Sequence, residues 1–391
     1  MILNLVADRV VKGRIYPALA THEARPYTQA WREFGQHYPY TVPVRLQEYC
    51  DHHNVKLGIF GIDNAFPSDA FYPIGLAFFN FDIDYIGLLP AKVTKLIKRQ
   101  QLRILFYYHE GDNPVRIRQR LDHLVAVHQL PKRCYVFVSA NSAADAVPGF
   151  VYFNDFELWY YQRNIGCSAL PVHQHSRERE FTVLNRLHKS WRATAMADLE
   201  QHNLLANSYW SYCESGALDQ DNPIEIDSID GLRDSTDYFL KNTPYISDTL
   251  DQAQRNNHSL LEPKYYTNSY CNIVMETHFD IESSSTFLTE KTFKPIKHGQ
   301  MFFIAGPAGS LQVLRDLGYR VFDSLLDNSY DLEPNATQRW MALTRSIFFA
   351  QPDLPQLFEL CRADIQHNQQ LFLSNKAHRL NTLIKEINES H

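Results

Sequence analysis

One stretch in the second half of the chain, from Cys271 to Phe322, decides the fold; it reads CNIVMETHFDIESSSTFLTEKTFKPIKHGQMFFIAGPAGSLQVLRDLGYRVF. Its apolar runs alternate with segments of helical spacing and with polar or Gly/Pro turns. The expected elements are a strand at Asn272–Met275, a helix opening at Thr289, a strand at Met301–Ala305, a helix at Leu311–Leu317 and a short third strand after Gly318. This βαβαβ order is typical of a doubly wound parallel sheet.

The triplet Thr289, Glu290 and Lys291 falls where such sheets bind ligands, at a helix N-terminus whose free N–H groups and dipole attract anions. Thr289 can cap the helix. A carboxylate can accept hydrogen bonds from a ribose diol, and an ammonium group beside it can neutralise a phosphate. A nucleotide would fit both groups, but the triplet alone is explained as well by Glu290 complementing the helix dipole while Lys291 is solvated.

The same stretch resembles the donor-binding segment of the α1,3-fucosyltransferases, through the runs Asn272-Ile-Val-Met-Glu276, Phe287-Leu-Thr-Glu-Lys291 and Gly306-Pro307. The resemblance implies the family's GT-B fold, in which two Rossmann-like domains face each other across a cleft. It also implies that Glu290 and Lys291 contact the ribose and phosphates of a GDP-fucose-like donor. Lys294, on the same helix, is a secondary phosphate candidate.

The chain departs from that family's pattern at two places. Thr277-His278 and a longer, Ser-rich loop stand where the family has Asn-Ser, and Pro295 should interrupt the expected helix by removing an internal hydrogen bond. The resemblance is therefore distant. The sugar and the nucleotide stay open, because base-reading residues lie in loops that differ here.

A second βαβ pattern lies in the first half of the chain. Leu102–Tyr108 predicts a strand, Asn113 and Pro114 a helix cap and first turn, and Tyr135–Ser139 the next strand. Glu110 follows the first of these strands, at its carboxyl end.

Glu110 is the candidate catalytic base. Inverting sugar transfer needs a carboxylate or imidazole to take the acceptor hydroxyl's proton while the diphosphate leaves from the opposite face. The run from Leu105 through Glu110 to Pro114 also resembles the family's strand ending in Glu-Ser-Pro, whose Glu is the proposed base. His109 and Asp112 remain alternatives.

A basic cluster follows the expected strand at Phe181–Leu184, where Asn185-Arg186 leads into a helix that carries Arg192. Guanidinium groups and free N–H groups together suit a diphosphate. The family resemblance implies that Arg192 contacts the phosphates, with Arg186 as the second choice; an exposed basic helix start is the simpler alternative.

Two possible metal signals are weak. Asp82-Ile-Asp84 matches the D-x-D pattern by which GT-A glycosyltransferases hold a divalent metal, so a metal-dependent GT-A transferase is an alternative. His173 and His175 lie in a segment better interpreted as an interdomain linker. We expect no metal and no cofactor beyond the nucleotide-sugar.

Length and composition agree with a two-domain enzyme of 391 residues, of which 45% are hydrophobic. The net charge of −6 does not favour nucleic-acid binding, although a nucleic-acid acceptor stays open beside a glycan or another hydroxyl-bearing molecule. The six cysteines contain no C-x-x-C pair, and the first apolar run is too short for a signal peptide or a membrane span. We therefore expect a cytoplasmic protein.

The sequence thus predicts an α/β, GT-B-like glycosyltransferase. We expect an acceptor-side Rossmann-like domain over residues 1–178, a nucleotide-sugar-binding Rossmann-like domain over 179–350, and a helical segment over 351–391 whose last helix crosses back onto the first domain. A non-catalytic nucleotide- or glycan-binding protein of the same fold is the alternative outside enzymes.

Overall fold

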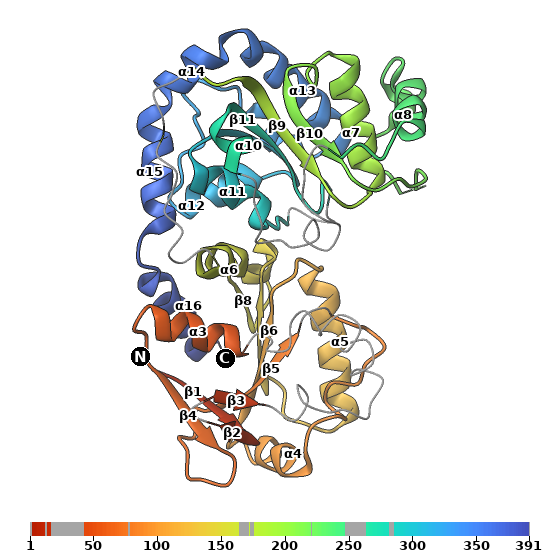
Figure 1. Cartoon of the computed structure of the whole chain (residues 1–391). Coiled ribbons are helices and arrows are strands. Elements are labelled where there is room, and N and C mark those ends of the chain that lie inside the picture. The colour runs from red at the N-terminus through yellow and green to blue at the C-terminus, as the bar shows by residue number, and fades with distance from the viewer. Residues whose placement is uncertain are drawn as a thin grey trace. The chain divides into compact units, whose positions relative to one another are not determined.

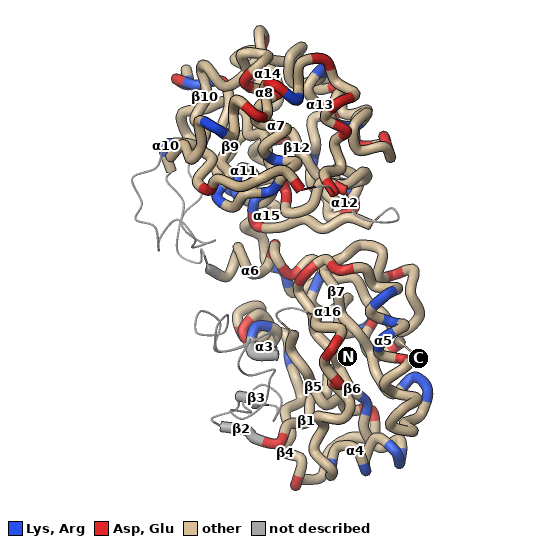
Figure 2. Tube along the Cα trace, turned by 90° about the vertical axis from the view of Figure 1, so that its right-hand side faces the viewer, with Lys and Arg blue, Asp and Glu red and all other residues tan. Residues whose placement is uncertain are grey.

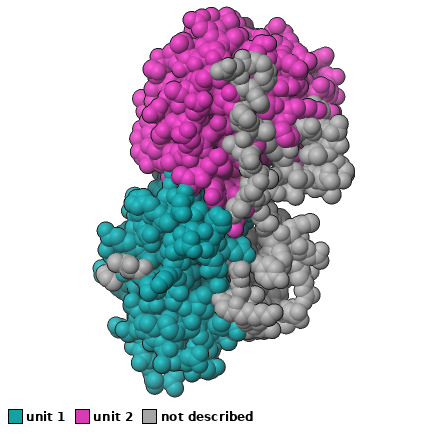
Figure 3. Space-filling view, turned by 60° about the vertical axis from the view of Figure 1, so that its left-hand side comes forward, with its two compact units in different colours: residues 1–159, 375–391 teal, residues 160–374 magenta. Residues whose placement is uncertain are grey.

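The computed structural model describes residues 2–11, 14–16, 43–76, 79–163, 172, 176–219, 221–246, 263–280 and 285–390. The chain folds into two compact units, Met1–Trp159 with Asn375–His391 (unit 1) and Tyr160–Ser374 (unit 2), coloured separately in Figure 3. The boundary thus falls at 159/160, not at the expected 178/179, and the segment 351–391 is divided between the units.

The boundary lies inside helix α6 (Asp155–Arg163), for a reason visible in its side chains. Asp155 is fully buried and pairs with Arg45 of unit 1 at 2.8 Å. One turn later, the rings of Tyr160 and Tyr161 lie 5.9 and 6.0 Å from Phe372 of unit 2. The two ends of one helix therefore belong to different cores.

Within the described residues, unit 1 contains a parallel sheet of six strands in the order β4-β1-β5-β6-β7-β8 (Figure 1). The strands are β1 (Leu3–Ala7), β4 (Leu57–Gly61), β5 (Phe71–Leu76), β6 (Arg103–Tyr108), β7 (Tyr135–Ser139) and β8 (Phe150–Tyr152). A short antiparallel hairpin joins β2 (Arg9–Val11) to β3 (Arg14–Tyr16). The expected β6–helix–β7 unit is confirmed.

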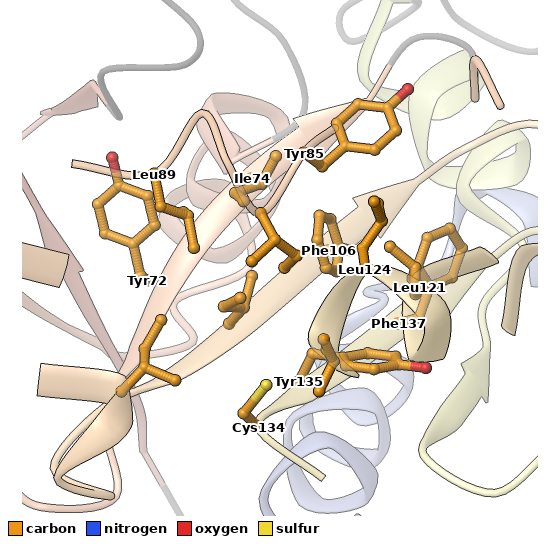
Figure 4. Packing of buried hydrophobic residues seen from close by; sticks show 14 of the residues in the cluster. Tyr72, Ile74, Tyr85, Leu89, Phe106, Leu121, Leu124, Cys134, Tyr135 and Phe137 are labelled. Atoms are coloured by element: carbon orange, nitrogen blue, oxygen red, sulfur yellow. The ribbon is translucent and has the colours of Figure 1, made fainter. Parts of the chain in front are cut away.

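Helices cover both faces of this sheet. On one face α4 (Ala91–Lys98) and α5 (Pro114–Val127) pack over an aromatic-rich core, in which Phe106 and Phe137 of neighbouring strands meet Leu121 of α5 (Figure 4). On the other face lie α3 (Pro43–His52) and α16 (Ala377–Glu389). A 3₁₀ turn, η1 (Ser142–Ala146), contacts β8 and α5. Burial of apolar side chains on both faces explains why the strands read as nearly continuous hydrophobic runs.

Unit 2 contains a second parallel sheet, with the described strands in the order β10-β9-β11-β12. These are β9 (Arg179–Asn185), β10 (Ser208–Tyr212), β11 (Ser269–Met275) and β12 (Met301–Ala305). The helices are α7 (Ser190–Gln201), α8 (Leu232–Lys241), α10 (Pro263–Thr267), α11 (Glu290–His298), α12 (Ser310–Asp316), α13 (Ala336–Ala350), α14 (Leu354–Leu360) and α15 (Arg362–Leu373), with 3₁₀ turns η2 (Ile226–Ser228), η3 (Ser329–Leu332) and η4 (Gln351–Asp353). The predicted α/β class, with two helix-flanked parallel sheets, is confirmed.

Two local predictions in unit 2 are wrong. Pro295 lies inside α11 and does not interrupt it. The third strand expected after Gly318 is absent from the described residues: Val321 and Phe322 are buried, and the Phe322 ring lies 5.1 Å from Phe302, but neither residue is in a strand. Phe322 has a φ of 65°, a left-handed backbone conformation that cannot continue an extended strand. The apolar pair belongs to the core without forming a strand.

The C-terminal helix returns to unit 1, as expected. Lys376, just before α16, and Arg379, in its first turn, both pair with the fully buried Glu157 of α6. At the other end of the helix, Arg103 donates to the carbonyl of Ser390 at 2.7 Å. The chain therefore passes between the units twice.

Candidate functional site

The strand order of unit 2 changes direction between β9 and β11. The chain leaves β9 for β10 on one side, and the later strands β11 and β12 lie on the other. In doubly wound sheets, ligands bind beyond the carboxyl ends of the two strands at this switch point. Here those ends are Asn185, which leads into α7, and Met275, which leads through a loop towards α11.

The start of α11 is held by a buried carboxylate to which the sequence pattern assigned no role. Glu276 has no exposed surface and accepts four hydrogen bonds, from the N–H (3.0 Å) and hydroxyl (2.6 Å) of Thr289, the hydroxyl of Thr292 (2.6 Å) and the N–H of Thr277 (3.1 Å). Thr289 caps the helix as expected, accepting from the N–H of Lys291. The signal available in the sequence was an acid at the end of a strand followed by two threonines three residues apart.

Three backbone N–H groups at this helix start are already hydrogen-bonded. Glu276 accepts from that of Thr289, the Thr289 hydroxyl from that of Lys291, and the Thr289 carbonyl from that of Thr292. An anion bound here would therefore depend mainly on side chains.

Glu290 and Lys291 lie together beside this carboxylate. Only 5% of the Glu290 side chain is exposed, compared with 29% for Lys291, whose Nζ lies 3.4 Å from Glu290 Oε1. The same Nζ contacts the hydroxyls of Thr277 and Thr289, both at 3.1 Å. Neither residue is a freely solvated surface charge. This weakens the alternative in which Glu290 only complements the helix dipole and Lys291 is solvated.

Lys294 and Arg186 extend the same cluster. Burial lowers the pKa of Lys294 to about 8; the positive charges of Arg186 and Lys291 lower it further, while Glu290 opposes them. Burial and neighbouring positive charges both disfavour the protonated form of a lysine. Three cations from two distant segments therefore gather near the Glu290 carboxylate.

The guanidinium of Arg192 is bound by backbone carbonyls. The residue is 3% exposed and donates to the carbonyls of Glu276 (2.6 Å), Met275 (3.2 Å) and Leu187 (3.4 Å). Nearby, Lys189 donates to the carbonyl of Thr277 at 2.7 Å. Both cations hold the end of β11 against the start of α7, and a phosphate role for Arg192 stays a prediction.

Three enclosed side chains at the β9–α7 junction have polar atoms with no hydrogen-bond partner among the described residues. They are both amide atoms of Asn185, the indole Nε1 of Trp191 and the Nε of Arg192. Buried polar atoms in folded proteins almost always have partners. These atoms therefore mark the junction as a place where a polar ligand or water would be stabilised.

We call Arg186, Lys189, Arg192, Lys291 and Lys294 the cationic cluster. It contains five positive side chains, with Glu276 and Glu290 as the negative charges in contact with it, in a chain whose net charge is −6. Figure 2 shows Lys and Arg segments gathered around α11. Such a local excess of positive charge suits an anionic ligand.

In unit 1, Glu110 follows β6 in a loop that is firmly held. Asn141 donates to the carbonyl of Gly111 at 2.8 Å, and the Tyr108 hydroxyl donates to the carboxylate of Asp112. The Glu110 side chain remains 38% exposed, and one of its oxygens lies 3.7 Å from Nε2 of His109.

Of the two alternatives to Glu110, His109 is poorly placed. It is 8% exposed, and burial, reinforced by Arg45, lowers the pKa of its imidazole well below the ordinary value. Such a group is neutral but largely out of reach of a substrate hydroxyl. Glu110 and Asp112 are therefore the accessible carboxylates of this loop and remain the candidates for the catalytic base.

The D-x-D pair of the GT-A alternative forms part of a turn. Asp84 accepts from the Gly87 N–H at 2.8 Å and contacts Nε2 of His128 at 2.7 Å. Burial alone would raise the pKa of Asp84, but these hydrogen bonds outweigh it and the pKa is lowered overall. Among the described residues, no group of three or more His, Cys, Asp or Glu side chains is arranged to hold a metal ion. His173 and His175 lie outside the described residues.

No protein-family model matches the chain, and no curated protein matches it. Among solved structures it is similar to T4 phage BGT in complex with UDP and Mn²⁺, with 8% identity, 100% of each chain covered and a TM-score of 0.37. It is also similar to the DNA modifying enzyme β-glucosyltransferase, solved with and without uridine diphosphoglucose, with 8% identity, 99% of each chain covered and a TM-score of 0.37. A TM-score of 0.37 is too low to carry an assignment, so any function must be argued from the side chains.

Within the described residues, no helix has both the length and the apolar character needed to cross a bilayer.

Proposed function

We propose that this chain is a GT-B-type glycosyltransferase, which moves a sugar from a nucleotide-sugar to an acceptor hydroxyl. The observation that carries the proposal is the cationic cluster at the switch point of unit 2, with the nearly buried carboxylate of Glu290 in its midst. A nucleoside diphosphate presents the complementary groups, a diphosphate for the cations and a ribose diol for the carboxylate.

In this proposal the ribose hydroxyls donate to Glu290. Lys291 neutralises the diphosphate together with Arg186 and Arg192, and the bound anion raises the lowered pKa of Lys294. The enclosed, unpartnered atoms of Asn185 and Trp191 supply further polar contacts in the same place. The resemblance to the fucosyltransferases suggests a GDP-sugar, and a screen of donors decides between it and other nucleotides.

The chemistry assigned to this chain is direct displacement with inversion. The acceptor oxygen forms a bond to the anomeric carbon as its proton passes to Glu110, and the bond from that carbon to the diphosphate oxygen breaks. The cationic cluster stabilises the charge that develops on the leaving diphosphate. The proton ends on Glu110 and the electron pair of the broken bond on the diphosphate.

Nucleotide binding tests the site. A thermal-shift screen of nucleoside diphosphates should reveal one that raises the melting temperature, because a ligand that binds only the folded state stabilises it by mass action. Calorimetry with that nucleotide should then show Lys291→Ala and Glu290→Ala each binding about 10- to 150-fold more weakly, since each removes a charged hydrogen bond of about 1.5–3 kcal/mol.

Lys241→Ala is the matched control, because Lys241 is an exposed lysine at the end of α8 in the same unit. Its affinity should equal that of the unaltered chain. If both site variants bind as tightly as this control, the site assignment is wrong.

Turnover distinguishes an enzyme from a binding protein. Release of nucleoside diphosphate from the donor identified in the screen, with water or an added acceptor, is the expected result. Binding without release would indicate a non-catalytic protein of the same fold. Activity lost with a chelator and restored by Mn²⁺ would support the metal-dependent alternative at Asp82 and Asp84.

A further inference from the structure

The turn Thr277-His278, where this chain departs from the fucosyltransferase pattern, lies between the two halves of the cationic cluster. Lys189 of the α7 start donates to the carbonyl of Thr277 at 2.7 Å, and Lys291 of α11 donates to its hydroxyl at 3.1 Å. The turn directly follows the end of β11, one of the two strands that flank the switch point. His278 is therefore placed where the proposed diphosphate would bind.

The charged surroundings of His278 are dominated by cations. Lys189 and Arg192 face it from α7 and Lys291 faces it from α11. Two acids of its own loop that the structure describes are already engaged: Glu276 holds the threonines at the start of α11, and Asp280 lies 3.3 Å from Arg339; Glu282, in the same loop, lies outside the described residues. The ring of Phe287, 6.1 Å away, provides an apolar neighbour.

The imidazole of His278 is neutral at physiological pH. Neither ring nitrogen forms a hydrogen bond within the described residues, and the side chain is partly buried. Burial lowers the pKa of His278 to about 4, and the charges of Lys189, Arg192 and Lys291 lower it further. An anion placed among the same three cations would reverse their effect on the ring.

We propose that His278 contacts the diphosphate of the bound nucleotide-sugar and takes up one proton from solvent as the donor binds. The inference rests on the proposed function and adds to it a binding residue outside the family motif, together with a pH dependence of donor affinity. No bond of the donor breaks in this step; a proton from solvent forms an N–H bond to the unprotonated ring nitrogen, and the resulting imidazolium donates to a phosphate oxygen.

The sign of the pH effect follows from linkage. Binding that takes up a proton becomes tighter as the pH falls, and the gain ends near pH 4, where the free chain is itself protonated. If the pKa of His278 in the complex returns to an ordinary value of about 6.5, affinity rises about tenfold between pH 8 and pH 5.5. Each phosphate of an intact nucleotide-sugar carries one ester and one anhydride bond, and neither phosphate titrates in this range.

Calorimetry on the full chain, with the intact nucleotide-sugar selected in the donor screen, tests the inference. Measurements between pH 5.5 and 8, in pairs of buffers with different ionisation enthalpies, give both affinity and proton uptake. Uptake should approach one proton near pH 5.5. Lys294, with a pKa of about 8, contributes only towards the upper end of the range.

His278→Asn is the matched variant, because its amide can still donate to a phosphate but does not titrate. It should melt at the same temperature as the unaltered chain without ligand, bind the donor within a few-fold at pH 8, and lose both the tenfold rise and the proton uptake at low pH. Uptake below pH 7 that persists in His278→Asn, or its absence below pH 7 in the unaltered chain, overturns the inference while the proposed function stands. Failure of any nucleotide to bind would overturn both.

Discussion

Glu110→Gln is expected to lower turnover by roughly a hundredfold or more, while donor affinity stays within a few-fold of the starting value. The substitution preserves the size and hydrogen-bonding shape of the side chain but cannot accept the proton of the acceptor hydroxyl. The loop should keep its form, because Asn141 holds the Gly111 carbonyl and Tyr108 holds Asp112. Initial rates and calorimetry on the same preparation measure the two quantities.

Asp112→Asn is the matched control on the same loop. The Asp112 carboxylate already accepts from the Tyr108 hydroxyl, and the amide can still accept that hydrogen bond, so a smaller loss of turnover is expected. Near-normal turnover in Glu110→Gln combined with a large loss in Asp112→Asn would transfer the role of base to Asp112. Normal turnover in both variants would place the base outside this loop.

Glu157→Ala is expected to destabilise unit 1 by roughly 3–5 kcal/mol, because it leaves two largely buried cations without their carboxylate. Glu157 has no exposed surface, and it pairs with Lys376 at 2.9 Å and with Arg379. Both cations lie at the N-terminal end of α16, where positive charge is unfavourable to the helix dipole. The negative charge of Glu157 therefore compensates two positive charges that interact unfavourably with the dipole at the N-terminus of α16.

Denaturant unfolding of the full chain measures this loss of stability. If the two units unfold in separate transitions, the transition of unit 1 gives the value. Hydrogen exchange should show faster exchange in α16 than in the unaltered chain. Asp63→Ala is the control, since Asp63 pairs with Lys92 at the surface of the same unit and is 83% exposed. Such a pair contributes at most about 1 kcal/mol. Equal stability losses in the two variants would contradict the assigned role of Glu157.

Local elements of the site were predictable because their signals lie in neighbouring residues. Thr289 caps α11 as expected, and the helix ends at Gly299, whose φ of 70° suits a residue without a Cβ atom. In unit 1, the side chain of Asn113 accepts from the N–H groups of Val115 and Arg116, as expected of a helix cap. Caps and periodic apolar positions are properties of a few adjacent residues.

Predictions that depended on distant neighbours were less successful. β1 (Leu3–Ala7) is an interior strand of the first sheet, yet from the sequence its residues were interpreted only as an apolar run too short for a membrane span. The residues after α12 were assigned as a strand from their apolar character, which a backbone angle at Phe322 contradicts. An apolar run indicates that a segment is buried, but it does not indicate which other strand or helix packs against that segment.

The sequence by itself determined the α/β class, the helix caps and the residue types that a nucleotide-binding site needs, because side-chain period and capping chemistry are encoded within a few residues. Only the tertiary structure decided that β9 and β11 lie side by side, which brings Arg186 and Lys189 to Lys291 across about a hundred residues of chain. It also decided that Glu276 accepts from the N–H of Thr289 at the start of α11, so that this group is not available to an anion. The order of the strands depends on burying the whole face of a sheet at once. A short segment of sequence carries no information about that.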